Sequence, residues 1–543
     1  MTHSMYNDNH FFETLNRVVD HVQQLGYDSQ LVSQVLGERG LAAAHGHNYA
    51  AAKWYAQRME NGERNRERNL ILGCYLREPL DRSQWELVLG PGITTDALAT
   101  GVIAHGRLQV DIRPVVVASH GTTEVLVVSD PDAAAEVQTG TSDHVPGAGN
   151  ASMSLLNVIP PQTPDPDSES HGSVTDVLDL GCGSGVLSTV LAANYPHLRV
   201  TGTDISSRAL AFARAGREVA ERGVENKSGD SATTAPQVEW LCGNWFEPVH
   251  GREFDVIVSN PPFVMAPPNR DQAKTYRESG LELDGASALV VGQAPEYLRV
   301  GGRAHLLTGW ALADGESAAQ RVSAWLPTHG VRAWVVQREL VSVADYVTTW
   351  LADEEVDTRS SEGRARVNEW LDYLGAHEVE RIGMGYVHLE RIADSKPLDM
   401  TFEVLDQPLP PGTFLGYEVH EWFARMQWLA ATDRADLLDS TFAIRPGVAV
   451  EHIEVADVEQ GQGFTPYALR LSRTEGPAWS HEIDEHVRAV ISGLNPQGLK
   501  LRDVAGLYCA VHGLDEAAFT DALMPIITDL IRHGFLLPAT ESA

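Results

Sequence analysis

The chain has few cysteines and no long hydrophobic run. Of its 543 residues four are cysteine, at positions 74, 182, 242 and 509. Their spacing matches neither a zinc site nor a disulfide framework, so we expect no metal and a reducing, cytoplasmic setting. Since no stretch of about 18 uncharged apolar residues occurs, we expect no transmembrane helix. Residues 1–10 are polar and lack the pattern of a signal peptide.

Positive charge is also scarce. Lys and Arg number 41 against 74 Asp and Glu, which gives a formal net charge of -33. Nucleic-acid-binding proteins usually carry a basic surface, because their affinity comes from neutralising phosphates. The arginines between positions 58 and 68 are interleaved with glutamates, which indicates a solvated helix face. The charge balance favours a protein partner, although a local basic patch or adaptation to a salty cytoplasm is compatible with it.

The length predicts about two to four domains. Residues 1–158 contain several segments with helical apolar spacing, followed by a predicted hairpin, Leu108–Val117 with Glu124–Ser129. Helices followed by a hairpin are typical of a winged-helix module, which binds nucleic acid in some proteins and other proteins elsewhere. Residues 159–173 are rich in proline, serine and acid and indicate a linker or surface loop. Residues 400–543 predict a C-terminal α+β module, winged-helix-like at its end.

Residues 174–395 alternate between strand-like and helix-like segments. Such alternation predicts an α/β layer sandwich with a mainly parallel sheet. The predicted strands are Asp176–Leu180, Arg199–Thr203, Val238–Cys242, Phe254–Ser259, Gly302–Thr308, Arg332–Gln337 and Met384–Leu389.

The strongest motif is a glycine-rich turn after the first of these strands. Residues 177–187 read Val-Leu-Asp-Leu-Gly-Cys-Gly-Ser-Gly-Val-Leu. The glycines let the backbone adopt positive φ close to a ligand, at the N-terminus of a helix. A P-loop needs Gly-Lys-Ser/Thr, whereas Val186 follows Gly185, and a dinucleotide site needs G-x-G-x-x-G rather than G-x-G-x-G. The remaining interpretation is S-adenosylmethionine (SAM), whose bound portion carries no phosphate. Asp179 would then face the methionine amino group.

Two further strand ends supply candidate cofactor contacts. Asp204 follows the second strand about 20 residues after the turn, a spacing suited to ribose hydroxyls. Taken alone, Asp204 is better explained by capping of the next helix, and it is the glycine turn and Asn244 in register that favour the cofactor interpretation. Asn244 follows the third strand and can hydrogen-bond adenine, with Trp245 or Phe246 against the ring. The predicted cofactor contacts are Asp179, Gly181, Cys182, Gly183, Gly185, Asp204, Ile205, Asn244 and Trp245.

The fourth strand ends in Asn260-Pro261-Pro262-Phe263, at the sheet edge where ligands of open α/β sheets bind. The two prolines stiffen this corner. The Asn260 amide oxygen and the Pro261 carbonyl can accept hydrogen bonds from a substrate N–H, and Phe263 can stack on a planar group. Two such acceptors draw a planar amino nitrogen towards tetrahedral geometry and restore its lone pair. The motif therefore predicts N-methylation with these four residues at the reaction site, the alternative being a plain turn.

Residues 174–310 resemble the class I SAM-dependent methyltransferases of the small-methyltransferase group, which includes release-factor glutamine methyltransferases and ribosomal-RNA guanine-N2 methyltransferases. The resemblance implies a Rossmann-like, seven-stranded domain flanked by the two modules, with SAM as cofactor at Asp179, Asp204 and Asn244 and substrate at the Asn-Pro-Pro-Phe corner. The glutamine enzymes usually carry Tyr at the position of Phe263 and Asp at that of Asn244, whereas Phe is common among the RNA enzymes. The whole chain is similar to an actinobacterial methyltransferase type with added N- and C-terminal modules.

Two segments beside the motifs invite a functional interpretation. Ser142–Ser152 precedes the first strand, where this family often places a segment that covers the cofactor, so that Asp143 and His144 would line the site. A turn and a helix cap explain this segment equally well. Met265–Asp271 and Tyr276–Gly280 indicate either a substrate-side lid or a solvated loop.

The acceptor is a macromolecule in both leading hypotheses. The first is N-methylation of a side-chain amide in a protein, most simply a glutamine of a translation factor. The alternative is an exocyclic amine of an RNA base, guanine N2 or adenine N6. Both acceptors present the same planar NH₂ group, so the motif does not separate them. A third hypothesis, a binding module with a degenerate methyltransferase fold, is disfavoured by the intact glycines, Asp204 and Asn260.

Overall fold

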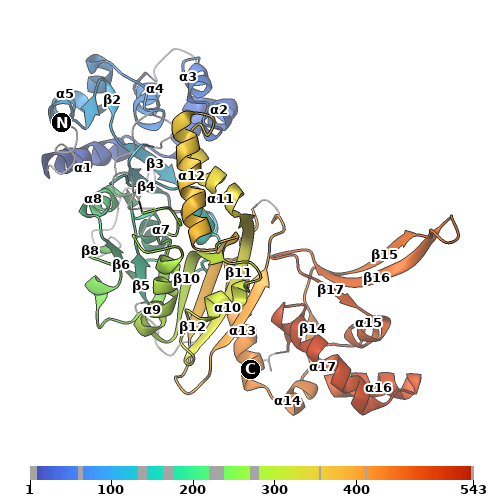
Figure 1. The fold of residues 1–543 in the computed structure, drawn as a ribbon. Helices are drawn as coiled ribbons and strands as arrows, with labels where there is room; N and C mark the ends of the chain where they lie inside the picture. Colours follow the sequence, from blue (N-terminus) through green and yellow to red (C-terminus); the bar gives the residue numbers. More distant parts are fainter. Residues whose placement is uncertain are drawn as a thin grey trace, which may run out of the picture. The chain divides into compact units, whose positions relative to one another are not determined.

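The structure of the protein, a computed structural model, describes residues 9–58, 65–131, 143–162, 175–218, 238–268, 280–353, 356–409 and 412–539. The chain forms two compact units (Figure 1). The first contains residues 1–156 and 162–406, and the second contains residues 157–161 and 407–543. The N-terminal and central regions, which we predict as separate domains, thus lie in one unit. None of the helices in the described ranges combines the length and apolar character of a membrane span.

The N-terminal part of the first unit is helical. In α1 the buried residues Phe11, Leu15 and Val18 recur at helical spacing and face a shared apolar core. Helix α5 is kinked at Gly90, where φ is 78°. The helices are α1 (Asn9–Gln24), α2 (Ser29–His45), α3 (Tyr49–Ala56), α4 (Asn65–Leu70) and α5 (Arg82–Thr100).

The predicted hairpin is present and extends into the central region. After a short pair, β1 (Ile103–Ala104) with β2 (Arg107–Leu108), strands β3 (Asp111–Val115) and β4 (Val125–Ser129) pair antiparallel. A third strand, β7 (Arg217–Glu218), pairs with β4. Because β7 follows α8 (Ser207–Ala215) of the central region, this small sheet connects the N-terminal part to the central region.

The central region contains one sheet in the order β13-β11-β12-β10-β9-β5-β6-β8. All seven predicted strands lie in it, and every pairing is parallel except those of β12 with β10 and β11. The strands are β5 (Thr175–Leu180), β6 (Leu198–Asp204), β8 (Val238–Cys242), β9 (Phe254–Ser259), β10 (Leu298–Leu312), β11 (Val331–Ser342), β12 (Arg381–Arg391) and β13 (Asp399–Val404).

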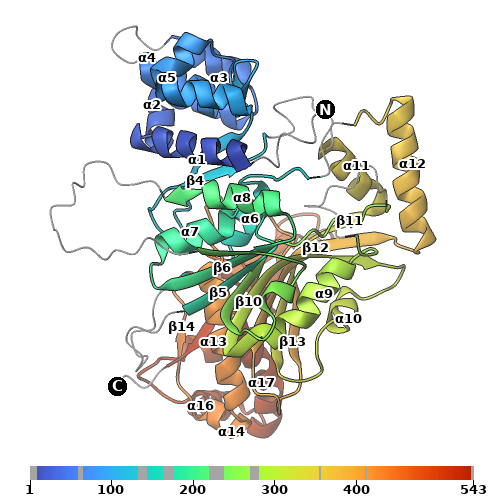
Figure 2. The same ribbon diagram turned by 90° about the vertical axis from the view of Figure 1, so that its left-hand side faces the viewer.

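Helices cover both faces of this sheet. Figure 2 shows α6 (Asn150–Leu156), α7 (Val186–Asn194) and α8 (Ser207–Ala215) on one side. It shows α9 (Gly285–Gln293) and α10 (Ala318–Ser323) on the other. Since β5, β6, β8 and β9 are parallel neighbours, their carboxyl ends meet at one edge, which is where the predicted site residues lie.

Two features of the sheet differ from the prediction. It has an eighth strand, β13, which lies beyond the predicted domain boundary at residue 395 and pairs with the otherwise open edge of β11. Arg332 Nε donates to Asp399 Oδ2 at 2.8 Å across this pair. In addition, α11 (Val343–Asp353) and α12 (Ser361–Ala376) are inserted between β11 and β12 and form a separate apolar cluster with the residues after Phe263.

The second unit is an α+β module. It contains a buried cluster of three charged side chains, in which Glu418 accepts hydrogen bonds from Arg425 and, at 2.6 Å, from Arg473. Burial opposes ionisation of Glu418, but the two guanidinium groups outweigh it and hold the pKa of Glu418 below its usual value. The helices are α13 (Gly416–Ala431), α14 (Arg434–Leu438), α15 (Glu485–Ser492), α16 (Leu501–His512) and α17 (Glu516–Arg532). The strands are β14 (Phe442–Ile444), β15 (Val448–Ala456), β16 (Phe464–Arg473), β17 (Ser480–Ile483) and β18 (Leu536–Pro538).

Candidate active site

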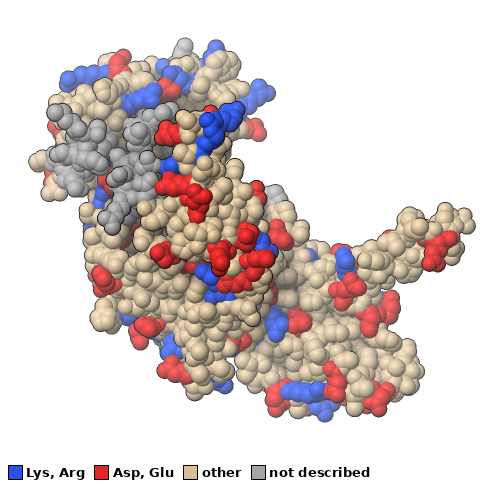
Figure 3. Space-filling view, viewed as in Figure 1, with Lys and Arg blue, Asp and Glu red and all other residues tan. Residues whose placement is uncertain are grey.

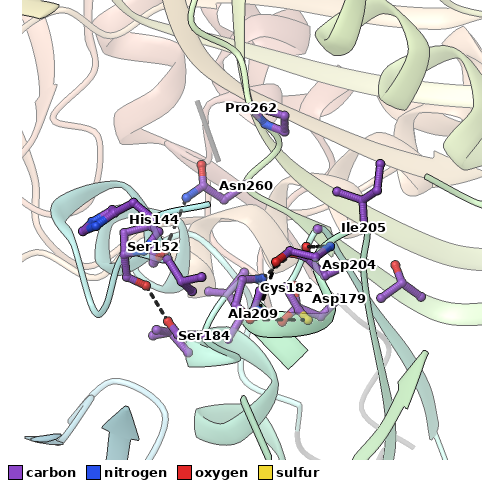
Figure 4. Close-up of a pocket in the computed structure, with 18 of the residues that line it drawn as sticks. His144, Ser152, Asp179, Cys182, Ser184, Asp204, Ile205, Ala209, Asn260 and Pro262 are labelled. Atoms are coloured by element: carbon purple, nitrogen blue, oxygen red, sulfur yellow. Dashed lines mark hydrogen bonds between the residues drawn. The ribbon is translucent and has the colours of Figure 1, made fainter. Parts of the chain in front are cut away.

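A pocket opens at the carboxyl edge of β5, β6, β8 and β9. It encloses about 1260 Å³, including its open mouth, which suits a ligand of nucleoside size or larger. Figure 4 shows Asn260 beside His144 and Ser152, with Asp204 and Ile205 across the pocket. Of the thirteen predicted site residues, those on the pocket lining are Asp179, Gly181, Cys182, Gly183, Asp204, Ile205, Asn244, Trp245, Asn260 and Pro262.

The glycine turn has the backbone that its sequence predicts. Gly181, Gly183 and Gly185 all have positive φ, at 72°, 53° and 77°. Gly185 does not line the pocket but allows close packing, because a Cβ there would lie 2.7 Å from a Trp240 ring carbon and 2.9 Å from Ala213 Cβ. Gly181 and Gly183 are therefore required for their positive φ. Gly185 is required for its positive φ and also because a side chain there would collide with its neighbours.

Asp179 lies at the base of the turn and is fully buried. One carboxylate oxygen, Oδ2, accepts from the backbone N–H and the hydroxyl of Ser188, at 3.0 and 2.6 Å. The other, Oδ1, has no hydrogen-bond partner within the described ranges. Burial, with a further contribution from Asp204, raises the pKa of Asp179 to about 6. A buried acceptor of this kind fits an ammonium group such as the amino group of SAM.

Asp204 closes the other side of the turn. Its Oδ2 accepts from the Gly183 N–H at 2.9 Å and its Oδ1 from the Ser206 N–H at 2.8 Å. Burial raises the pKa of Asp204, and these two bonds partly offset the effect. The side chain that caps α8 is Ser206, which accepts from the Ala209 N–H. Asp204 thus lines the pocket and is not the cap of α8. This position is the one expected of an acid that binds ribose hydroxyls.

The third strand end divides its aromatic residues between pocket and core. Asn244 and Trp245 line the pocket, and Trp245 has a positive φ of 45°. Phe246 turns inward, where it is 2% exposed and stacks on Tyr297 at 4.4 Å between ring centroids. Trp245, and not Phe246, is therefore the aromatic residue available to a ligand, together with Ile205 on the neighbouring strand end.

The Asn-Pro-Pro-Phe corner is only partly directed at the pocket. Ser259, the last residue of β9, donates to the Leu180 carbonyl at 2.7 Å and joins the corner to the glycine turn. Asn260 Nδ2 donates to Ser152 Oγ at 3.4 Å, which leaves Asn260 Oδ1 available as an acceptor. Pro261 is buried and off the lining, and Phe263 packs edge-on against Trp350 at 6.3 Å between ring centroids.

Several lining residues lie outside the motifs. Asp143 and His144 line the pocket, so the covering interpretation of that segment agrees with the geometry. Ser152 belongs to the same segment and Ser184 to the glycine turn, although neither is among the predicted site residues, whereas nothing in the local sequence shows that Ala209 faces the site. The lid predicted over 265–280 lies outside the described residues from 269 to 279. Within the described part of the chain, no group of three His, Cys, Asp or Glu side chains is arranged to hold a metal ion.

Comparisons with known proteins indicate the family of the region that contains most of this pocket. Residues 151–306 match the family described as "Methyltransferase small domain", and residues 420–538 match a domain of unknown function. A release factor glutamine methyltransferase of Bordetella pertussis is 32% identical over 168 residues, covering 29% of this chain and 56% of that protein. A second one, of Xylella fastidiosa, is 35% identical over 147 residues, covering 26% and 49%.

A relative of the RNA type also matches. The ribosomal RNA small subunit methyltransferase C of Citrobacter koseri is 37% identical over 131 residues, covering 24% of this chain and 30% of that protein. The chain thus spans about half the length, or less, of these relatives. The central domain is a class I SAM-dependent methyltransferase domain of the small-methyltransferase group, with SAM as its cofactor.

Proposed function

We propose that the protein methylates a planar amide nitrogen, namely a glutamine side chain of a protein of the translation release factor type. The observation that carries the proposal is the position of Asn260 and Pro262 on the same pocket as Asp179 and Asp204. The corner that would bind a planar N–H₂ group thus adjoins the two carboxylates that would hold SAM.

The residues of the pocket divide into two tasks. Asp179 and Asp204 would hold SAM by its amino group and its ribose hydroxyls. When bound, SAM supplies an electrophilic methyl group. Asn260 Oδ1 is oriented by the bond from its own amide to Ser152 and would accept a hydrogen bond from the substrate nitrogen. Such a bond favours pyramidal nitrogen and restores the lone pair, so a strong base is not required.

A protein acceptor is supported by charge and by the relatives. The net charge of -33 disfavours a polyphosphate partner. In the view of Figure 3, Lys and Arg lie in small groups interspersed with Asp and Glu, and they do not form one continuous basic surface. Two of the relatives reported above are named for glutamine methylation of a release factor.

The alternative acceptor is an exocyclic amine of an RNA base. Phe263 at the last motif position favours it, and so does the relative named for ribosomal RNA. The helix-then-hairpin order of the N-terminal part is compatible with either acceptor. We retain the cytoplasmic location as a prediction, supported by four cysteines that are all free.

The test is methyl transfer from tritiated SAM to two defined acceptors, a purified release factor and a purified small ribosomal subunit, each with wild-type protein and Asn260→Ala. We expect label in the release factor, recovered after hydrolysis as N-methylglutamine, and no label with the variant. Label in the ribosomal RNA would establish the alternative instead. Label in neither acceptor would contradict the proposal and would exclude the small ribosomal subunit as the alternative acceptor.

A further inference from the structure

One wall of the pocket comes from outside the methyltransferase motifs. Residues 143–147, which we call the pocket wall, precede the first strand of the sheet, and all five line the pocket. Ser184 of the glycine turn donates its hydroxyl hydrogen to the Pro146 carbonyl at 2.7 Å. Figure 4 shows His144 of this wall on the Asn260 side of the pocket. The position of the wall therefore affects the space available to a ligand between the turn and the reaction corner.

The wall is anchored to the end of the N-terminal hairpin. Asp130 directly follows β4, and its backbone N–H donates to the Val145 carbonyl at 3.0 Å. The Val145 N–H returns a bond to Asp130 Oδ2 at 2.7 Å. This reciprocal pair of bonds holds the middle of the wall against the hairpin.

A buried charge completes the anchor. Both terminal nitrogens of Arg208, on α8, donate to the two carboxylate oxygens of Asp130. Arg208 Nη1 also donates to the Asp143 carbonyl at 2.8 Å, at the start of the wall. Asp130 is 8% exposed and Arg208 is 6% exposed. A forked ion pair shielded from water fixes geometry more tightly than a neutral hydrogen bond.

Helix α8 connects this anchor with both the pocket and the N-terminal helices. Ala209, the residue after Arg208, lines the pocket. One turn further along, Phe212 packs against Phe12 of α1, with ring centroids 5.4 Å apart. The Arg208 guanidinium lies 4.9 Å from the centroid of the Phe212 ring. A continuous set of contacts, from Phe12 through Phe212 and Arg208, therefore joins the N-terminal helices to the wall.

We propose that Asp130 and Arg208 are positioning residues for SAM, and that the N-terminal hairpin is thereby part of the cofactor site. Neither side chain lines the pocket. They act by holding the wall in the conformation that a bound ligand needs, so the ordering of the wall is complete before binding. The proposal concerns the cofactor and is independent of which nitrogen receives the methyl group.

The test uses Arg208→Lys and Asp130→Asn in the full chain, with S-adenosylhomocysteine as the probe in titration calorimetry. Lysine retains the charge but loses the fork, and asparagine retains the shape but loses the charge. We expect Kd to rise at least about tenfold for Arg208→Lys, because charge-assisted bonds that hold the wall are lost. Hydrogen exchange of peptides covering 143–147 should accelerate in both variants, because the charged fork that fixes the Asp130 carboxylate, the acceptor of the Val145 N–H, is lost.

A matched control separates positioning from general loosening. Arg332 is similarly buried and also forms ion pairs with two acids, donating at 2.8 Å to Glu390 and at 2.8 Å to Asp399. It lies on β11, and neither it nor its partners line the pocket. Arg332→Lys should lower the unfolding temperature about as much as Arg208→Lys and leave the Kd unchanged.

Two results would overturn the proposal. One is wild-type affinity in folded Arg208→Lys and Asp130→Asn. The other is an equal loss of affinity in Arg332→Lys, which would mean that any weakened unit binds poorly. If Arg208→Lys does not fold, Asp130→Asn decides, because it still offers an acceptor to the Val145 N–H. A failed methyl-transfer assay leaves this result intact, since binding of S-adenosylhomocysteine needs no acceptor.

Discussion

The cofactor half and the acceptor half of the pocket are built in different ways. In the cofactor half, apart from the pocket wall, the ligand-facing groups follow directly on adjacent strand ends, and Asp204 bonds the glycine turn 21 residues earlier. In the acceptor half, Asn260 is oriented by Ser152, 108 residues earlier. The loop after Phe263 is held there by Tyr346 of the inserted α11, whose hydroxyl accepts from the Met265 N–H at 3.0 Å, 81 residues away.

The difference indicates where change is tolerated. A turn and its neighbouring strand end form one local unit, in which each residue has several partners. The acceptor half is assembled from the N-terminal side, the sheet and an insertion, so its shape can vary while SAM binding persists. Variants should therefore separate binding of SAM from transfer of its methyl group.

The largest effect is expected at the corner. Asn260→Ala removes the acceptor that faces the substrate nitrogen, and we expect transfer to fall by at least about 10²-fold. The Kd for SAM in titration calorimetry should remain at the wild-type value, because Asn260 is not among the groups assigned to hold SAM. Near-normal transfer by this variant would remove Asn260 from the mechanism.

A smaller effect is expected at Asp204. Asp204→Ala should weaken SAM binding on the order of tenfold to hundredfold, because two hydroxyls lose a charged acceptor. Transfer at saturating SAM should fall far less than in Asn260→Ala. Calorimetry and single-turnover kinetics distinguish the two variants, and an unchanged Kd would exclude Asp204 from the site.

Because of Asp179, we expect the affinity for SAM and the stability of the unliganded fold to change in opposite directions with pH. Its pKa, raised to about 6 by burial, lies above the unfolded value of 3.8. Its ionisation therefore disfavours the unliganded fold, and its contribution to stability is lost as pH rises through about 6. Binding of an ammonium group needs the ionised form, so SAM affinity should be about tenfold lower at pH 5 than at pH 8.

Asp179→Asn is the control for that pH profile. Asparagine does not titrate, so both pH dependences should flatten, in calorimetry for binding and in thermal unfolding for stability. A wild-type pH profile in Asp179→Asn would assign the titration to another group.

The smallest effect is expected at the insertion. Tyr346→Phe leaves the Met265 N–H without its acceptor and should lower the free energy of unfolding by about 1 kcal/mol. Transfer should fall a few-fold at an unchanged Kd for SAM. Tyr373→Phe on α12 is the matched control, since its hydroxyl accepts from the Leu283 N–H at 3.3 Å. A loss of SAM affinity in Tyr346→Phe would contradict the division into two halves.

The same division explains how far the sequence predicts the structure. The spacing of apolar residues and the residue types in the turns predict the seven strands, the glycine turn and Asp204. Each of these features depends on residues within one strand–turn–helix segment. The eighth strand, the core position of Phe246 and the packing of Phe263 against Trp350 depend on partners far along the chain. The kink in α5 at Gly90 is by contrast a local effect, because Gly90 and Pro91 favour a break in the helix.

The central claim is that one pocket holds the methyl donor beside the Asn260 corner. A crystal structure with S-adenosylhomocysteine tests it most directly. The account predicts the amino group at Asp179, the ribose at Asp204 and the sulfur facing Asn260. A ligand bound elsewhere, or one whose sulfur points away from Asn260, would contradict it.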